Sequence, residues 1–163
     1  MNIPSFSSRE EILPLFQALL DEQVTTIDQL KEWIVRRDAL DNQLSDDYAW
    51  RYIQQSRWTE DVWYKERFMH FVEKIMPEWQ RMSDQLNRHL IACPCLDQLD
   101  KPYQVYLRSV KKSIDLFREE NISLQEQDQK LATQYQTFRA AMRGTYQGQE
   151  LAWQQAGKYL EGN

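Results

Sequence analysis

Glycine and proline are scarce in this sequence, which has four glycines and five prolines among 163 residues. In an average protein the two together make up about 12% of the chain, more than twice the share found here. Sandwiches and barrels need many tight turns, and those turns depend on glycine and proline. The scarcity therefore excludes an all-β architecture. With 28% charged residues and many glutamines, it favours long helices with polar outer faces.

Cysteine and histidine, on which much enzyme and metal chemistry depends, are also scarce, with two of each. Cys93 and Cys95 form a Cys-Pro-Cys motif. Two ligands cannot complete a tetrahedral zinc site, and the spacing is not the Cys-x-x-Cys of redox enzymes. We interpret them as two unreactive thiols at the end of a helix, with a metal or redox role as the alternative.

The motifs of the common catalytic sites are missing from the sequence. It contains no His-Glu-x-x-His zinc helix, no glycine-rich phosphate loop and no Gly-x-Ser-x-Gly nucleophile turn. We therefore predict no catalytic residue, no cofactor-binding residue and no metal-binding residue in this chain.

The sequence also lacks an excess of positive charge and any long apolar run. Its net charge is −5, and nucleic-acid binding relies on lysine and arginine, so we expect no nucleic-acid partner. No segment approaches the ~20 apolar residues of a membrane span. The apolar stretch from Ile12 to Leu20 follows acidic residues and contains Pro14, unlike a secretory signal. We expect a cytoplasmic protein with no membrane association.

The patterns that are present predict an all-α fold. Ser8 with Glu11 and Thr26 with Gln29 have the spacing of helix capping boxes. We predict a single domain over 1–163, built as an antiparallel array of six or seven helices with at most one small β-hairpin. The expected helices are 8–21, 27–43, a short one from the Ser-Asp-Asp sequence 45–47 to about 56, 59–92, 102–121, 123–142 and 150–160, with a loop or hairpin at 143–150.

The longest of these predicted helices, 59–92, carries the clearest apolar stripe. Seven residues follow one another at steps of three or four, which is the helical period. Pro77 falls inside the segment, so we expect a kink near 73–77 rather than a break. Trp79 of this stripe and Phe117 of the next helix are predicted core residues. Trp63 and Met69 lie outside the stripe and predict an exposed apolar patch. The stripe consists of Phe68, Val72, Ile75, Trp79, Met82, Leu86 and Leu90.

Two charged clusters are candidates for a metal-binding or catalytic site. Helical spacing places Glu66, His70 and Glu73 on one face, close enough to share a metal, but that face points away from the apolar stripe. We interpret this cluster as a solvated face, with a metal or general-acid role as the alternative. The second cluster is an ordinary exposed face in which the side chains four residues apart can pair; it consists of Arg108, Lys111, Lys112 and Asp115.

Several segments resemble the N-terminal region of oligoendopeptidase F-type zinc peptidases, which are relatives of thimet oligopeptidase. The most specific segment is Leu-Phe-Arg-Glu-Glu-Asn at 116–121. The resemblance extends from about residue 25 to the end of the chain. It is also carried by Trp33, Tyr52, Phe68, Phe71, Ile75-Met76-Pro77, Leu86-Asn87-Arg88-His89-Leu90, Ala92-Cys93-Pro94, Tyr103, Leu107-Arg108-Ser109-Val110, Leu124, Tyr135, Ala141-Met142, Gly148-Gln149-Glu150 and Tyr159-Leu160.

This resemblance implies a cytoplasmic, nearly all-helical zinc metallopeptidase that cleaves short peptides inside a deep channel. The family's zinc ligands and general base lie on a His-Glu-x-x-His helix downstream of the region matched here, so none of them is carried over to this chain. In the family the matched region forms one wall of the channel and restricts which peptides enter. A short hairpin near Gly148 is also a feature of the family.

Two functional hypotheses follow from the sequence. In the first, the chain is the channel-wall fragment of such a hydrolase, inactive alone, with short peptides as the full enzyme's substrates. Its partner would then be the catalytic region or a second copy of itself, and zinc would belong to full-length members only. In the second, the chain is a stand-alone helical module that binds another protein.

Overall fold

The computed structural model describes residues 5–152 and Tyr159. Helix accounts for 77% of the structure, which confirms the all-α fold class. None of the helices in this part of the chain is long and apolar enough to cross a membrane. The α-helices are α1 (Arg9–Leu20), α2 (Ile27–Arg57), α3 (Val62–His70), α4 (Met76–Ile91), α5 (Tyr103–Leu116) and α6 (Glu119–Ala141).

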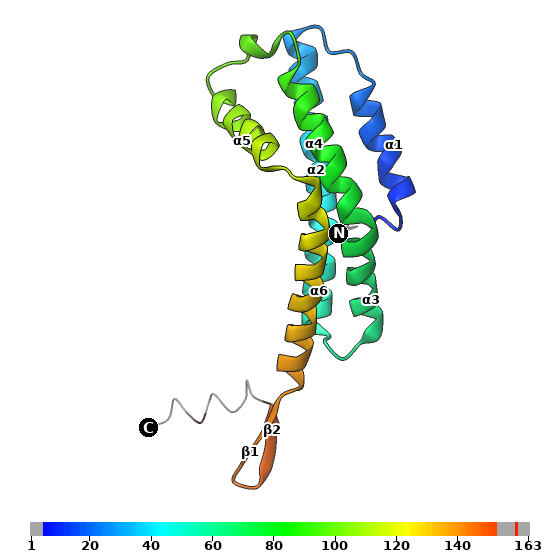
Figure 1. The fold of residues 1–163 in the computed structure, drawn as a ribbon, viewed down its shortest axis with the longest axis vertical. Helices are drawn as coiled ribbons and strands as arrows, with labels where there is room; N and C mark the ends of the chain where they lie inside the picture. Colours follow the sequence, from blue (N-terminus) through cyan, green and yellow to red (C-terminus); the bar gives the residue numbers. More distant parts are fainter. Residues whose placement is uncertain (1–4, 153–158, 160–163) are drawn as a thin grey trace.

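The helices form an antiparallel array (Figure 1). α1 and α2 run in opposite directions, α3 and α4 return along α2, and α5 and α6 run back again. α4 packs against α1 on one side and α5 on the other, while α3 packs against α2. A short 3₁₀ helix, η2 (Leu96–Gln98), lies in the connection between α4 and α5.

Because α3 and α4 are joined without a break by residues 71–75, the described residues form five continuous helices, fewer than the six or seven predicted. One reason is that α2 continues through Ser45, where we predicted a break. The carboxylate of Asp47 is buried and pairs with Arg51 one turn later, so the polar sequence reads as helix interior rather than as a new start. The second reason is that Gln149–Ala152 is a β-strand. The predicted helix 150–160 therefore does not begin at 150, and its remainder lies largely outside the described residues.

Pro77 is accommodated by a π-helical segment, η1 (Phe71–Ile75), between α3 and α4. The Met76 N–H donates to the carbonyl of Phe71, five residues earlier, which is the π-helical pattern. A proline has no N–H to donate and clashes with the preceding turn of an α-helix. The wider π turn therefore lets α3, η1 and α4 continue as one unit across the predicted kink.

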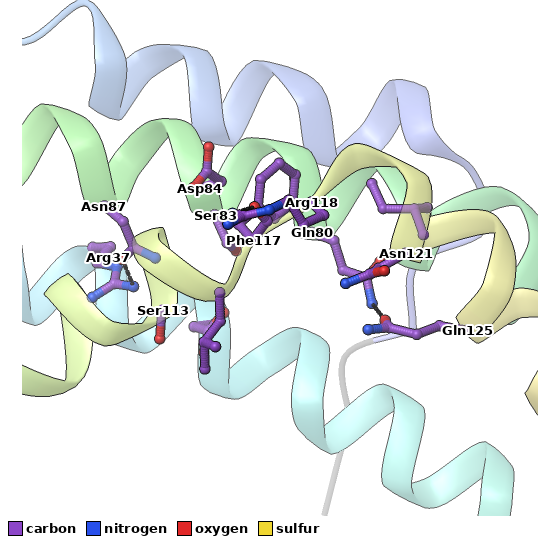
Figure 2. A pocket seen from close by; sticks show the side chains of 13 residues that line it. Arg37, Gln80, Ser83, Asp84, Asn87, Ser113, Phe117, Arg118, Asn121 and Gln125 are labelled. Atoms are coloured by element: carbon purple, nitrogen blue, oxygen red, sulfur yellow. Dashed lines mark hydrogen bonds between the residues drawn. The ribbon is translucent and has the colours of Figure 1, made fainter.

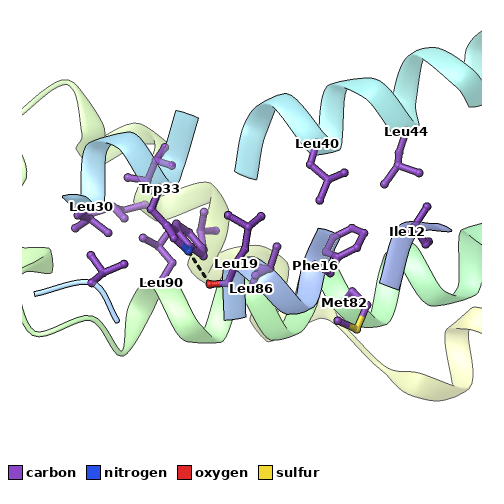
Figure 3. Packing of buried hydrophobic residues seen from close by; sticks show 14 of the residues in the cluster. Ile12, Phe16, Leu19, Leu30, Trp33, Leu40, Leu44, Met82, Leu86 and Leu90 are labelled. Atoms are coloured by element: carbon purple, nitrogen blue, oxygen red, sulfur yellow. Dashed lines mark hydrogen bonds between the residues drawn. The ribbon is translucent and has the colours of Figure 1, made fainter. Parts of the chain in front are cut away.

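The main core lies where α1, α2 and α4 meet (Figure 3). The indole Nε1 of Trp33 donates to the carbonyl oxygen of Leu19 at 2.9 Å, which ties α2 to the end of α1. Of the predicted stripe, six residues are buried, and Trp79 is half-buried against the core. Phe117 is also half-buried rather than in the core, because it caps the end of α5.

The N-terminal ends of the helices agree only in part with the predicted capping boxes and helix starts. Thr26 and Gln29 form both bonds of the capping box at the start of α2. At α1 the side chain of Ser8 makes no capping bond, and the carboxylate of Glu11 instead accepts from the N–H of Ser7 at 2.9 Å. α6 begins at Glu119, before the predicted helix start at 123. Residues 119–121, which we predicted as the end of helix 102–121, therefore form the first turn of α6.

Candidate functional site: the outer face of α6 and the adjoining cavity

The outer face of α6 carries an apolar stripe that we name by its four residues, Leu124, Leu131, Tyr135 and Phe138. Their exposed fractions are 58%, 64%, 63% and 68%. Steps of seven, four and three residues put them within an arc of about 60° on the helix. Contiguous exposed apolar surface is uncommon on a monomer and usually marks an interface.

The opposite side of α6 faces the bundle and is mostly polar. Ile122 is the single apolar residue of the helix that is buried. The ammonium of Lys130 pairs with the carboxylate of Glu73 at 3.0 Å, and the amide of Gln55 donates to Gln136 at 3.1 Å. An amphipathic helix normally turns its apolar side to the core. α6 has the opposite orientation, with its apolar stripe toward solvent and its mostly polar side toward the bundle.

Directly after α6 comes a two-stranded antiparallel hairpin, β1 (Arg143–Tyr146) and β2 (Gln149–Ala152). Figure 1 shows it extending beyond the end of α6, away from the main core. Among the described residues its ion pair to the bundle joins Arg143 and Glu60 at 3.7 Å. A two-stranded hairpin by itself is only marginally stable in water. The hairpin and the α6 stripe therefore lie together at an end of the molecule that makes few contacts with the main core.

A cavity of about 320 Å³ lies where α5 ends and α6 begins, against α2 and α4 (Figure 2). Its polar lining includes four carboxamide side chains: Gln80, Asn87, Asn121 and Gln125. The amide of Gln80 donates to the carbonyl of Gln125 at 2.5 Å. This bond links α4 to the first turns of α6 and closes one side of the cavity.

Arg37 closes the cavity on the side of α2. Its Nη2 donates to the Asn87 side-chain carbonyl at 2.7 Å, and its Nη1 donates to the Tyr106 hydroxyl. That hydroxyl donates in turn to Asp38 Oδ1 at 3.1 Å. Burial raises the pKa of Tyr106 to about 12, against the opposing effect of the Arg37 charge. The network fixes the Arg37 guanidinium between α4 and α5.

Two carboxylates, Asp41 and Asp84, also line the cavity. Asp41 Oδ1 accepts from Trp79 Nε1 at 2.7 Å. Asp84 is buried, and its Oδ2 accepts from Arg88 Nε at 2.7 Å. The described residues that line the cavity include serines and amides but no histidine or cysteine to serve as a base or thiol nucleophile. Side-chain amides both donate and accept hydrogen bonds, so the lining is suited to a ligand rich in peptide groups.

Glu66 and His70 both lie in α3 and are exposed, as predicted for a solvated face. Glu73 lies in η1, is half-buried and pairs with Lys130. The π segment changes the helical phase after His70, which the wheel argument could not include. Within the described part of the chain, no group of three histidine, cysteine or acidic side chains is placed to hold a metal ion.

The second charged cluster is an exposed face of α5. Arg108, Lys111, Lys112 and Asp115 are all exposed. Lys111 and Asp115, both described, do not form the ion pair that their spacing allowed. The backbone carbonyl of Asp115 instead accepts from the guanidinium of Arg118 at 2.9 Å. The two thiols of Cys93 and Cys95 are free and lie in the connection between α4 and α5.

The exposed apolar patch predicted on helix 59–92 is confirmed in part. Trp63 is 53% exposed, but Met69 is half-buried. The α6 stripe is a second exposed apolar surface, which was not predicted. Its residues have helical spacing in the sequence, but spacing alone does not show which side of a helix faces outward. A usable signal was the polar character of the opposite side of α6, where a core-facing helix should be apolar.

Comparison with known proteins identifies the family. The family model described as the peptidase M3 N-terminal domain matches residues 7–117. The match covers more than half of the chain, which therefore belongs to this family as an N-terminal region of an M3-family peptidase. No curated protein and no solved structure matches the chain. The matched region ends at the cap of α5, so α6 and the hairpin lie beyond it.

Proposed function

We propose that this chain is the N-terminal, non-catalytic part of an oligoendopeptidase F-type zinc peptidase that cleaves short peptides. In this role its α6 stripe docks against the catalytic part, and the helices of the matched region form a wall that limits access of peptides to the channel. The observation that carries the proposal is the inverted orientation of α6, with its apolar side outward and its polar side on the bundle.

The family match supports this assignment of the partner. The region matched as an N-terminal domain ends at residue 117, and the apolar stripe follows within the next helix. A surface placed directly after an N-terminal domain is well positioned to contact the part of the polypeptide that comes next. The hairpin, which makes few contacts with the bundle, would gain its missing support from the same partner.

The cavity beside α6 supports a role in peptide handling. Its carboxamides offer hydrogen-bond donors and acceptors, and the Arg37 guanidinium offers further donors. These are the groups that can pair with the C=O and N–H groups of a peptide backbone. The two carboxylates of the described lining, Asp41 and Asp84, accept hydrogen bonds from Trp79 and Arg88, so we limit this contribution to binding and orientation. Hydrolysis would be the task of the catalytic part.

Zinc does not fit the residues of this chain that the structure describes. Glu73 is occupied by Lys130, and the ring of His89 packs against Trp33 with 5.6 Å between the ring centroids. With no third donor near either histidine, we assign no step of a metal-dependent reaction to this chain.

The test is a binding titration with the separately produced catalytic region of an oligoendopeptidase F-type peptidase. We expect the chain to bind and the substitution Phe138→Glu, alone or with Leu131→Glu, to weaken binding about tenfold or more, because a charge would be buried in an apolar contact. Ala132→Glu is the matched control, since Ala132 is exposed on α6 but lies about 100° from Leu131.

Equal effects of Phe138→Glu and Ala132→Glu would reject the α6 stripe as the docking surface. Failure of the chain to bind the catalytic region at all, together with a monomer in sedimentation, would favour the alternative of a stand-alone interaction module. Circular dichroism of each variant separates a lost contact from a lost fold.

A further inference from the structure

The two cysteines of the chain are closer together than their sequence spacing suggests. The Sγ atoms of Cys93 and Cys95 lie 3.1 Å apart. A disulfide bond is about 2.05 Å long, so the sulfurs need to approach by only about 1 Å to be joined. Pro94 stands between them and restricts the backbone of the turn. Cys93 is half-buried and Cys95 is buried, and both are free thiols.

The thiol pair also joins two connections at the same end of the bundle. Cys93 Sγ lies 3.8 Å from the carbonyl oxygen of Val24, and Cys95 Sγ lies 3.5 Å from that of Thr26. Both carbonyls belong to the connection between α1 and α2, at the top of Figure 1. The thiol hydrogens therefore contribute to holding the segment after α4 against the start of α2.

We propose that Cys93 and Cys95 form a reversible dithiol–disulfide pair that a low-molecular-weight disulfide, such as oxidised glutathione, oxidises. In the first step the Cys93 thiolate attacks one glutathione sulfur, which breaks the glutathione disulfide and releases one glutathione thiolate. In the second step the Cys95 thiolate attacks Cys93 Sγ and releases the second glutathione thiolate. Two protein thiols are oxidised, one external disulfide is reduced, and the two protons pass to the released thiolates or to water.

The geometry assigns the order of the two steps. Cys93 is the more accessible thiol and is reached first by a molecule in solution. Burial raises the pKa of Cys95, which disfavours its direct attack on an external disulfide. Once Cys93 carries glutathione, the second step is intramolecular between groups already in contact, and such proximity accounts for large rate gains. Oxidation consumes both S–H donors and so releases the carbonyls of Val24 and Thr26.

The experiment incubates the full chain with oxidised glutathione, traps remaining thiols with an alkylating agent and measures intact mass. We expect the native chain to lose two hydrogen atoms, to take up no alkylating agent and to keep no glutathione. The Cys95→Ser variant lacks the second nucleophile and should accumulate one glutathione on Cys93. Reduction with dithiothreitol should return the native chain to two reactive thiols.

Three results would overturn the proposal. They are a native chain that retains two alkylatable thiols, a native chain that accumulates bound glutathione, and a disulfide that joins two copies of the chain on a non-reducing gel. A Cys95→Ser variant that remains unmodified while the native chain forms its internal disulfide would overturn the assigned order. Far-ultraviolet circular dichroism of both proteins guards against misfolding as the cause.

Discussion

At the residue scale, the strongest single polar feature is the buried pair of Asp47 and Arg51. The guanidinium of Arg51 donates to both carboxylate oxygens of Asp47, at 2.8 and 3.1 Å, and to the carbonyl of Phe6 at 2.7 Å. Asp47 also accepts from the N–H of Phe6 at 2.9 Å. This network attaches the segment before α1 to α2, and Arg51 Nη1 extends it to the carbonyl of Arg67 on α3.

We expect Asp47→Ala to lower the free energy of unfolding by about 3–5 kcal/mol, because it leaves the Arg51 charge buried without its partner. The neighbouring Asp46 is exposed, so Asp46→Ala should change stability by less than about 0.5 kcal/mol. Urea denaturation followed by circular dichroism measures both. Similar small losses for the two variants would show that the buried pair is not needed for the fold.

Tyr106 supplies a pH-dependent prediction. Burial raises its pKa to about 12, whereas in an unfolded chain it is about 10. The unfolded state therefore loses the proton first, so this contribution to stability is present below about pH 10 and is lost as pH rises toward 12. Relative to Tyr106→Phe, the native chain should lose stability across that range. Parallel stability curves for the two proteins would contradict the assignment.

Residues were less predictable than the segments in which they lie. The sequence placed Phe68, Val72 and Leu86 on one buried stripe, and all three are buried. It did not anticipate Asp47 in the interior, because adjacent aspartates after a serine are typical of a helix start. The i, i+4 spacing of Asp47 and Arg51 was the signal that was available. Proximity of the two thiols depends on the exact course of a turn, which no pattern of residue types specifies.

At the element scale, α3, η1 and α4 show how one local feature affects a site. The predicted span was close to the observed one, and the residues of the apolar stripe face the core on both sides of the π segment. The polar residues do not share one face, since Glu73 faces α6 whereas Glu66 and His70 are exposed on α3. A uniform helical wheel cannot describe a helix that changes its pitch, which is why the wheel placed Glu73 on the same face as Glu66 and His70.

Of the predicted alternatives at 143–150, a loop or a hairpin, the structure shows the hairpin, and the backbone of its turn explains the glycine. Gln147 and Gly148 have positive φ angles of 49° and 81°, as required at both positions of the two-residue turn that favours a hairpin. We expect Gly148→Ala to destabilise the hairpin by about 1–2 kcal/mol, the cost of a left-handed backbone for a residue with a side chain.

Gly144→Ala is the control for that substitution, because an added Cβ there has open space and the backbone is not left-handed. Amide exchange within β1 and β2 is the appropriate measurement, since the hairpin makes few contacts with the bundle. Faster exchange in Gly148→Ala, with the helices unchanged, is the expected result. Equal exchange in the two variants would mean that the turn does not determine the stability of the hairpin.

At the scale of the whole molecule, two ends of the bundle differ in how well they are packed. The end formed by α1, α2 and α4 contains the main apolar core. The end formed by α6 and the hairpin turns its apolar residues outward and attaches to the rest through polar contacts. The helical spacing of the α6 stripe is visible in the sequence, but the side of the helix that faces outward is not, because it depends on which neighbour is present.

The most direct test of the docking proposal is amide hydrogen exchange across the chain with and without the separately produced catalytic region. If the α6 stripe is the docking surface, protection should increase in α6 and the hairpin, over 119–152, and should remain unchanged in α1 and the first half of α2. Increased protection confined to α1 and α2, or none in α6 at saturating catalytic region, would contradict the account.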